Sequence, residues 1–162
     1  MPIAHRKARV FCWVARDWTP LAAQWRALDR DEFWVTGIAT PAQHRIDLAP
    51  SVCEPLRVFY ARGFVPYLTS DENLGFSEAL VTLAHEAEHI RQPDASEAVV
   101  ECHALQRVRG LVRDAGHGPR YEAELAGLAL VVSYPNRAEA YRTRNCYSGG
   151  PYDLHPDSKT WP

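Results

Sequence analysis

The chain has 162 residues, of which 46% are hydrophobic and 23% charged, and its formal net charge at pH 7 is -2. This length and composition are typical of one globular domain with a sizeable core. The small net charge gives no reason to expect nucleic acid or a membrane surface as a partner. No apolar run approaches the roughly 20 residues of a membrane span, and the apolar stretch over residues 10–15 is too short and too broken for a secretory signal. We therefore expect a cytoplasmic protein.

The N-terminal third predicts a helix followed by a hairpin. Residues 10–14 could form a short strand. Thr19 is a good N-cap with Pro20 at the first helical position, which predicts a helix over 20–30. Residues 33–39 are β-branched and aromatic, residues 44–48 alternate, and a turn-like segment separates them, so we predict an antiparallel hairpin.

Two further helices are predicted before the middle of the chain. Ser51 and Glu54 form a capping-box pattern that begins a helix running to about residue 62, where Gly63 stops it. Residues 64–73 read as a loop with a short extended piece. A strongly apolar helix follows from about residue 74 to 92 and ends before Pro93.

The helix over 74–92 contains the most specific motif of the chain, His-Glu-Ala-Glu-His at residues 85–89. Residues four apart share one face of a helix, so His85 and His89 can bind the same metal ion. Glu86 can then sit beside a metal-bound water, whose pKa zinc lowers to about 7. The spacing therefore predicts a zinc site with Glu86 as the catalytic base.

The next helix, predicted over 95–114, offers the third ligand. Asp94 and Glu97 form a second capping box at its start. Glu101 lies in the middle of an apolar face, where a carboxylate is costly to bury unless it is paired or bound to metal. We therefore favour Glu101 as the third ligand and keep Glu97, one turn earlier, as the alternative.

The C-terminal part predicts helices and then an irregular segment. Residues 116–119 form a turn, residues 121–133 a mostly buried helix, and residues 137–145 a short helix that carries Tyr141. Residues 146–162 are rich in Gly, Pro and Asp, which indicates an irregular strap over the body. The whole predicts a single α+β domain over residues 1–162, helix-rich, with a small antiparallel sheet packed on the motif helix.

The four cysteines are spaced far apart and contain no Cys-x-x-Cys pair, which disfavours a zinc ribbon or a thioredoxin-type site. Three disulfide pairings are possible. In a cytoplasmic protein four buried thiols are the favoured interpretation. The residues concerned are Cys12, Cys53, Cys102 and Cys146.

With its motif and a glutamate on the following helix, the middle third resembles the gluzincin group of zincin metallopeptidases, in particular the minigluzincins. The resemblance implies zinc held by His85, His89 and a glutamate, with Glu86 as general base and acid. No Gly-x-x-His follows the motif, which disfavours metzincins. The tail resembles that of uncharacterised actinobacterial zincin-like proteins at Cys146, Gly149, Gly150, Asp153, Leu154, Pro156, Trp161 and Pro162.

A peptidase also needs a donor for the oxyanion that forms on the attacked carbonyl. Tyr141 is the candidate that we name as catalytic, although packing against a helix also explains it. The other candidates are expected at the surface or in a solvated loop, and Asp153 could orient a ligating histidine. These remaining donor candidates are His103, His117 and His155.

Three classes of function follow from these observations. The first is a zinc-dependent hydrolase that cleaves a peptide or a small amide. The second is a structural or vestigial zinc domain, closed by a fourth ligand such as Cys102, that acts as an interaction module. The third is an interaction module in which the motif is accidental. Glu86 has no structural reason to stand between two ligands, so the hydrolase is favoured.

Overall fold

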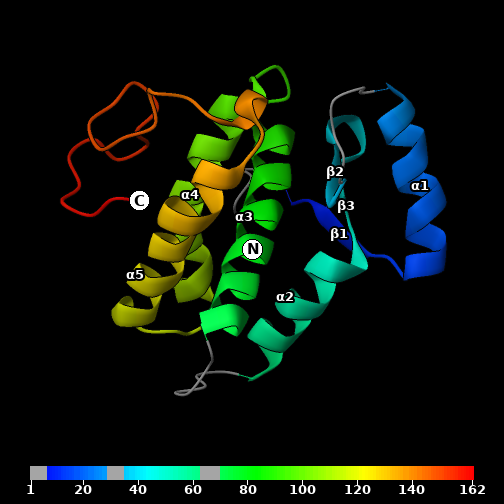
Figure 1. Ribbon diagram of the computed structural model, residues 1–162, viewed down its shortest axis with the longest axis horizontal. Coiled ribbons are helices and arrows are strands. Elements are labelled where there is room, and N and C mark those ends of the chain that lie inside the picture. Colours follow the sequence, from blue (N-terminus) through cyan, green and yellow to red (C-terminus); the bar gives the residue numbers. More distant parts are fainter. Residues whose placement is uncertain (1–6, 29–34, 63–69) are drawn as a thin grey trace.

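Helix α3 (Ser70–Arg91), which carries the motif, runs through the centre of the molecule (Figure 1). The computed structural model describes residues 7–28, 35–62 and 70–162. Residues 79–88 of this helix are all buried, because it packs against helices on one side and a small sheet on the other. A helix that is apolar on most faces is stable only in such surroundings.

A sheet with three strands among the described residues lies beside α3 (Figure 1). β2 (Gly37–Thr40) and β3 (Arg45–Leu48) form the predicted antiparallel hairpin. β1 (Arg9–Cys12) adds to the other edge of β3 in parallel, so the sheet is mixed and not wholly antiparallel. β2 is therefore the edge that faces α3, which it contacts.

Two of the predicted helices are present, as α1 (Ala15–Leu28) and α2 (Pro50–Arg62), but the residues predicted to cap them have other roles. α1 begins before Thr19, whose hydroxyl donates to the carbonyl of Ala15 within the helix. In α2, Glu54 forms an ion pair with Arg57 and so does not close a capping box. Both errors arise because Ser, Thr and Glu near a helix start have other partners available.

The second half of the chain is helical up to the tail. α4 (Glu97–Asp114) and α5 (Pro119–Leu128) pack on α3, and a π-helical turn over Ala129–Ser133 continues α5. Short 3-10 turns follow at Tyr134–Asn136 (η3) and Glu139–Tyr141 (η4). The α+β class with a small sheet on the motif helix is thus confirmed.

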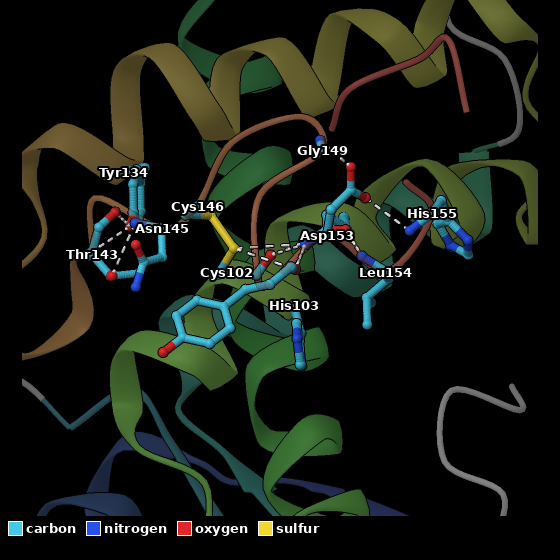
Figure 2. The surroundings of a disulfide bond; sticks show 12 residues. Cys102, His103, Tyr134, Thr143, Asn145, Cys146, Gly149, Asp153, Leu154 and His155 are labelled. Atoms are coloured by element: carbon cyan, nitrogen blue, oxygen red, sulfur yellow. Dashed lines mark hydrogen bonds between the residues drawn. A yellow bond between two sulfur atoms is a disulfide. The ribbon is translucent and has the colours of Figure 1, made fainter. Parts of the chain in front are cut away.

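The described tail, residues 142–162, contains turns and bends but no helix or strand. Figure 2 shows how it is fastened to α4 by a disulfide between Cys102 and Cys146. Gln106 of α4 also bonds the tail, donating to the carbonyl of Tyr152 and accepting from the amide of Leu154. The tail is therefore a strap held by covalent and polar contacts.

A second disulfide joins Cys12, the last residue of β1, to Cys53 in α2. The expectation of four free thiols is therefore wrong: the described chain has no free cysteine. Separations of 41 and 44 residues explain the error, because pairs so distant leave no local pattern in the sequence.

Among the described residues, no helix is both long enough and apolar enough to cross a membrane.

Candidate metal centre

The two motif histidines lie where α3 crosses the first turns of α4. His85 and His89 are one turn apart on α3, and their rings are 4.7 Å apart between centroids. The side chain of His85 is 9% exposed and that of His89 is 19% exposed. The i, i+4 spacing thus places both imidazoles on one face, as the sequence predicted.

Three potential ligand atoms converge at this point. His85 Nε2 lies 3.0 Å from His89 Nε2 and 3.0 Å from a carboxylate oxygen of Glu97, and the same oxygen lies 3.3 Å from His89 Nε2. In a tetrahedral zinc site with bonds of about 2.0–2.1 Å, ligand atoms are roughly 3.3 Å apart. Within the described part of the chain, this group of residues could hold a metal ion.

Glu101 lies behind His85 and not on the face where the ligand atoms meet. Its Oε2 is 2.9 Å from Nδ1 of His85, the ring nitrogen opposite to the one that faces His89. Its Oε1 accepts a hydrogen bond from Nε of Arg137 at 2.9 Å. The structure thus brings Glu97, and not the predicted ligand Glu101, to the point where the two Nε2 atoms meet, and Arg137 and His85 are the partners of the buried Glu101 carboxylate.

Glu97 does not have the capping role that its position suggested. The N-cap of α4 is Ser96, and no side-chain hydrogen bond caps the helix there. The carboxylate of Glu97 instead faces His85 and His89 across the helix crossing. Glu97 is the first residue of α4, and its side chain extends toward α3.

The electrostatics of the cluster reflect two carboxylates around one imidazole. Burial by itself would lower the pKa of His85, but hydrogen bonds to Glu101 and Glu97 and the nearby negative charges raise it to about 10. Burial would likewise raise the pKa of Glu97, yet hydrogen bonds from His85 and His89 lower it to about 2. The two carboxylates therefore favour the protonated form of His85, and a metal ion that binds Nε2 competes with a proton there.

Glu86 is buried and packs against the edge strand of the sheet. A Cβ atom added to Gly37 of β2 would lie 2.5 Å from Oε1 of Glu86 and 2.7 Å from its Cγ. A larger residue at position 37 would require the Glu86 side chain to shift. The edge strand thus lies directly against the side chain of the predicted base, which follows His85 in α3.

Tyr141 lies at the same site, although it is distant in sequence. Its ring centroid is 5.5 Å from that of His85, with the rings tilted by 34°. The short turn η4, which packs on α4, carries it there. Arg137 belongs to the same segment and is the site residue that sequence reasoning missed, since an arginine in a polar stretch gives no signal of its partner.

The remaining donor candidates are elsewhere. His103 contacts Gln92 at 2.7 Å and is partly buried, so it is not the surface residue expected. The ring of His117 is buried against Phe59 and Tyr121, and neither ring nitrogen has a hydrogen-bond partner, contrary to the solvated loop expected. His155 is exposed, and its amide donates to Asp153.

Asp153 does not orient a ligating histidine. Its two carboxylate oxygens accept hydrogen bonds from the amides of Gly149 and His155 within the tail (Figure 2). It is therefore a residue that shapes the strap. Glu101, and not Asp153, lies at hydrogen-bonding distance from a motif histidine, with its Oε2 2.9 Å from Nδ1 of His85.

Comparison with protein-family models, with curated proteins and with solved structures gave no match. The interpretation of the site therefore depends on the residues and distances given above.

Proposed function

We propose that the protein is a zinc-dependent hydrolase that cleaves peptide or other amide bonds. The observation that carries the proposal is the convergence of His85 Nε2, His89 Nε2 and a Glu97 oxygen within 3.0–3.3 Å of one another. Glu86 follows the first of these residues directly and is held against the sheet. Two imidazoles, one carboxylate and an adjacent second carboxylate suit hydrolysis.

The donor set favours zinc among the common metal ions. Imidazole nitrogen and carboxylate oxygen are usual zinc ligands, whereas calcium and magnesium prefer oxygen ligands throughout. His85 has its Nδ1 toward Glu101, which leaves Nε2 for the metal and fixes the orientation of the ring. His85, His89 and Glu97 are thus the residues that would hold the ion.

Each residue of the site has a role in the proposed reaction. When bound, zinc acts as a Lewis acid that polarises the carbonyl and makes a water molecule acidic near neutral pH. Glu86 would accept a proton from the water that attacks the carbonyl carbon and would deliver it to the amide nitrogen as the carbon–nitrogen bond breaks. We assign to Tyr141 the donation of a hydrogen bond to the developing oxyanion, because its ring lies on His85.

A position for water is supported by the number of available ligands. Cys102, a possible fourth ligand in a closed structural site, is bonded to Cys146. Among the described residues, the ligand cluster contains His85, His89 and Glu97 and no fourth His, Cys, Asp or Glu. Three protein ligands and one open position are the pattern of catalytic zinc sites.

The disulfides bear on where the protein acts. Disulfides persist in oxidising environments and are rare in the reducing cytosol of most cells. The pairs Cys12–Cys53 and Cys102–Cys146 therefore favour an oxidising compartment over the cytoplasm that the sequence suggested. We include such a compartment in the proposal.

The test compares wild type with Glu86→Gln, which keeps the shape of the side chain but removes the base. A mixed peptide library is incubated with each zinc-loaded protein and analysed by mass spectrometry, and metal content is measured in parallel. We expect about one zinc per chain in both proteins and at least a roughly hundredfold loss of cleavage in the variant.

Glu78→Gln serves as the matched control, because Glu78 is an exposed acid on the same helix and should leave cleavage unchanged. Cleavage that survives in Glu86→Gln would contradict the mechanism. Zinc-loaded wild type that cleaves no peptide and no small amide would favour a structural zinc domain. Wild type that takes up no metal would refute the proposal as a whole.

A further inference from the structure

The carboxylate of Glu101 has two partners, one on each oxygen. Oε2 faces Nδ1 of His85 at 2.9 Å, and Oε1 accepts from Nε of Arg137 at 2.9 Å. Glu101 is only 2% exposed. Water therefore has little access to replace either partner, and a buried carboxylate that loses one of them pays a large desolvation cost.

Arg137 and His85 are linked through this one carboxylate. The guanidinium holds Oε1 and thereby restrains the carboxylate, whose other oxygen, Oε2, lies toward His85. Oε2 then holds the Nδ1 side of the His85 ring, so that Nε2 faces Glu97 and His89. The same contact keeps Glu101 away from the face where the ligand atoms meet.

The segment that carries Arg137 is fastened to α4 at two consecutive residues. Glu101 forms an ion pair with Arg137. Its neighbour Cys102 forms a disulfide with Cys146, which Figure 2 shows. The hydroxyl of Tyr134 also donates to the carbonyl of Thr143 and accepts from its amide, which joins the chain before Arg137 to the chain after it. These contacts hold the backbone around Arg137 in place next to α4.

We infer that Arg137 is a positioning residue of the metal site, acting through Glu101 to set the orientation and hydrogen bonding of His85. The inference rests on the proposed function, since it concerns the same site. Outer-shell partners of metal-binding histidines typically change metal affinity by about 10- to 100-fold when they are removed. Arg137 contacts Glu101, and Glu101 contacts His85. Any effect of Arg137 on metal affinity is therefore transmitted by Glu101.

The experiment measures cobalt(II) binding by Arg137→Ala, Arg137→Lys and wild type, with Arg142→Ala as the matched control. Arg142 is an exposed arginine of the same segment. We expect Arg137→Ala to bind cobalt about 10- to 100-fold more weakly, with a changed visible absorption spectrum. Arg137→Lys should recover part of the affinity because it restores the positive charge, and Arg142→Ala should match wild type.

A second measurement uses the metal-free proteins. In wild type, an Nδ1-bound proton of His85 should be visible by nitrogen-correlated NMR, because Glu101 protects it. In Arg137→Ala this signal should broaden or disappear, whereas a purely structural role would leave it in place in folded protein. Circular dichroism confirms folding, and Arg137→Lys provides the comparison if the alanine variant does not fold.

The outcomes separate this inference from the proposed function. Cobalt affinity, spectrum and His85 proton that are all unchanged in folded Arg137→Ala would overturn the inference. Wild type that binds no cobalt or zinc would refute the proposed function, and the NMR signal would still decide whether Arg137 positions His85.

Discussion

Glu97 and Glu101 can be separated as ligand and supporting residue by replacing each with glutamine. Glu97 contacts both His85 and His89 on the side where the ligand atoms meet. Glu101 contacts the opposite nitrogen of His85 and also Arg137. The first substitution should therefore affect metal binding most, and the second should affect the stability of the metal-free protein most.

The expected sizes follow from these contacts. Loss of a direct ligand should weaken zinc binding more than about a hundredfold, whereas loss of an outer partner costs about 10- to 100-fold. Zinc at a thousand times its Kd stabilises the fold by about 4.1 kcal/mol, and a hundredfold weaker Kd leaves about 1.4 kcal/mol. For a chain of this length the difference lowers Tm by about 5–11 °C.

The metal-free proteins should show the opposite order. The side chain of Glu97 is 39% exposed, so its loss should cost no more than about 1 kcal/mol. Glu101 is buried, and its loss leaves His85 without one partner and Arg137 without its ion pair, at about 1–3 kcal/mol. Urea unfolding in the presence of a chelator measures this cost.

The assay is therefore a zinc titration and two melting curves, with and without zinc, for each variant. Glu97→Gln should lose most of its zinc-dependent rise in Tm and keep its metal-free Tm. Should Glu101→Gln abolish binding while Glu97→Gln keeps it, the ligand would be Glu101, and the argument from ligand-atom distances would be refuted.

Three further predictions concern other parts of the fold. Gly37→Ala should keep zinc but reduce hydrolysis about a hundredfold, because the added Cβ displaces Glu86; unchanged turnover would contradict this. Burial lowers the pKa of His117, so the unfolded chain binds its proton more readily and stability falls as pH drops below about 6.5. In His117→Phe, urea unfolding at several pH values should show a smaller loss, and an identical acid limb would refute the assignment. Replacing the two cysteines of either disulfide with serine should lower the free energy of unfolding by roughly 4 kcal/mol in the chain-entropy estimate. Zinc affinity should fall when the Cys102–Cys146 pair is replaced, but not when the Cys12–Cys53 pair is replaced.

The parts of the fold that sequence could predict are those set by local periodicity. The motif helix and α4 have long apolar patterns, and a spacing of four residues puts His85 and His89 on one face wherever the helix lies. The hairpin of β2 and β3 was predicted for a similar reason, because alternation and a short connection define it locally. The parallel addition of β1 depends on tertiary packing and has no such signal.

The choice between Glu97 and Glu101 required information that is not local. The sequence argument held that a buried carboxylate on an apolar face needs a partner, and Glu101 is indeed buried. The partner is Arg137, 36 residues further along the chain, together with His85. The physical premise was sound, but it did not distinguish a metal from an arginine as the compensating charge.

The exposure of the site residues is a further reason to place Glu97 and not Glu101 at the proposed ion. Side-chain exposure rises from 9% at His85 to 19% at His89 and 39% at Glu97, while Glu101 lies behind His85 at 3%. The side of His89 and Glu97 is therefore the side of the cluster that is more open to water. A three-ligand zinc site needs such an open side for its fourth position, and the acid that orients a ligand works best where water cannot compete. Glu97 lies on the exposed side, where the proposed ion needs an open position, and Glu101 lies in the buried position behind His85, where the proposed orienting acid is protected from water.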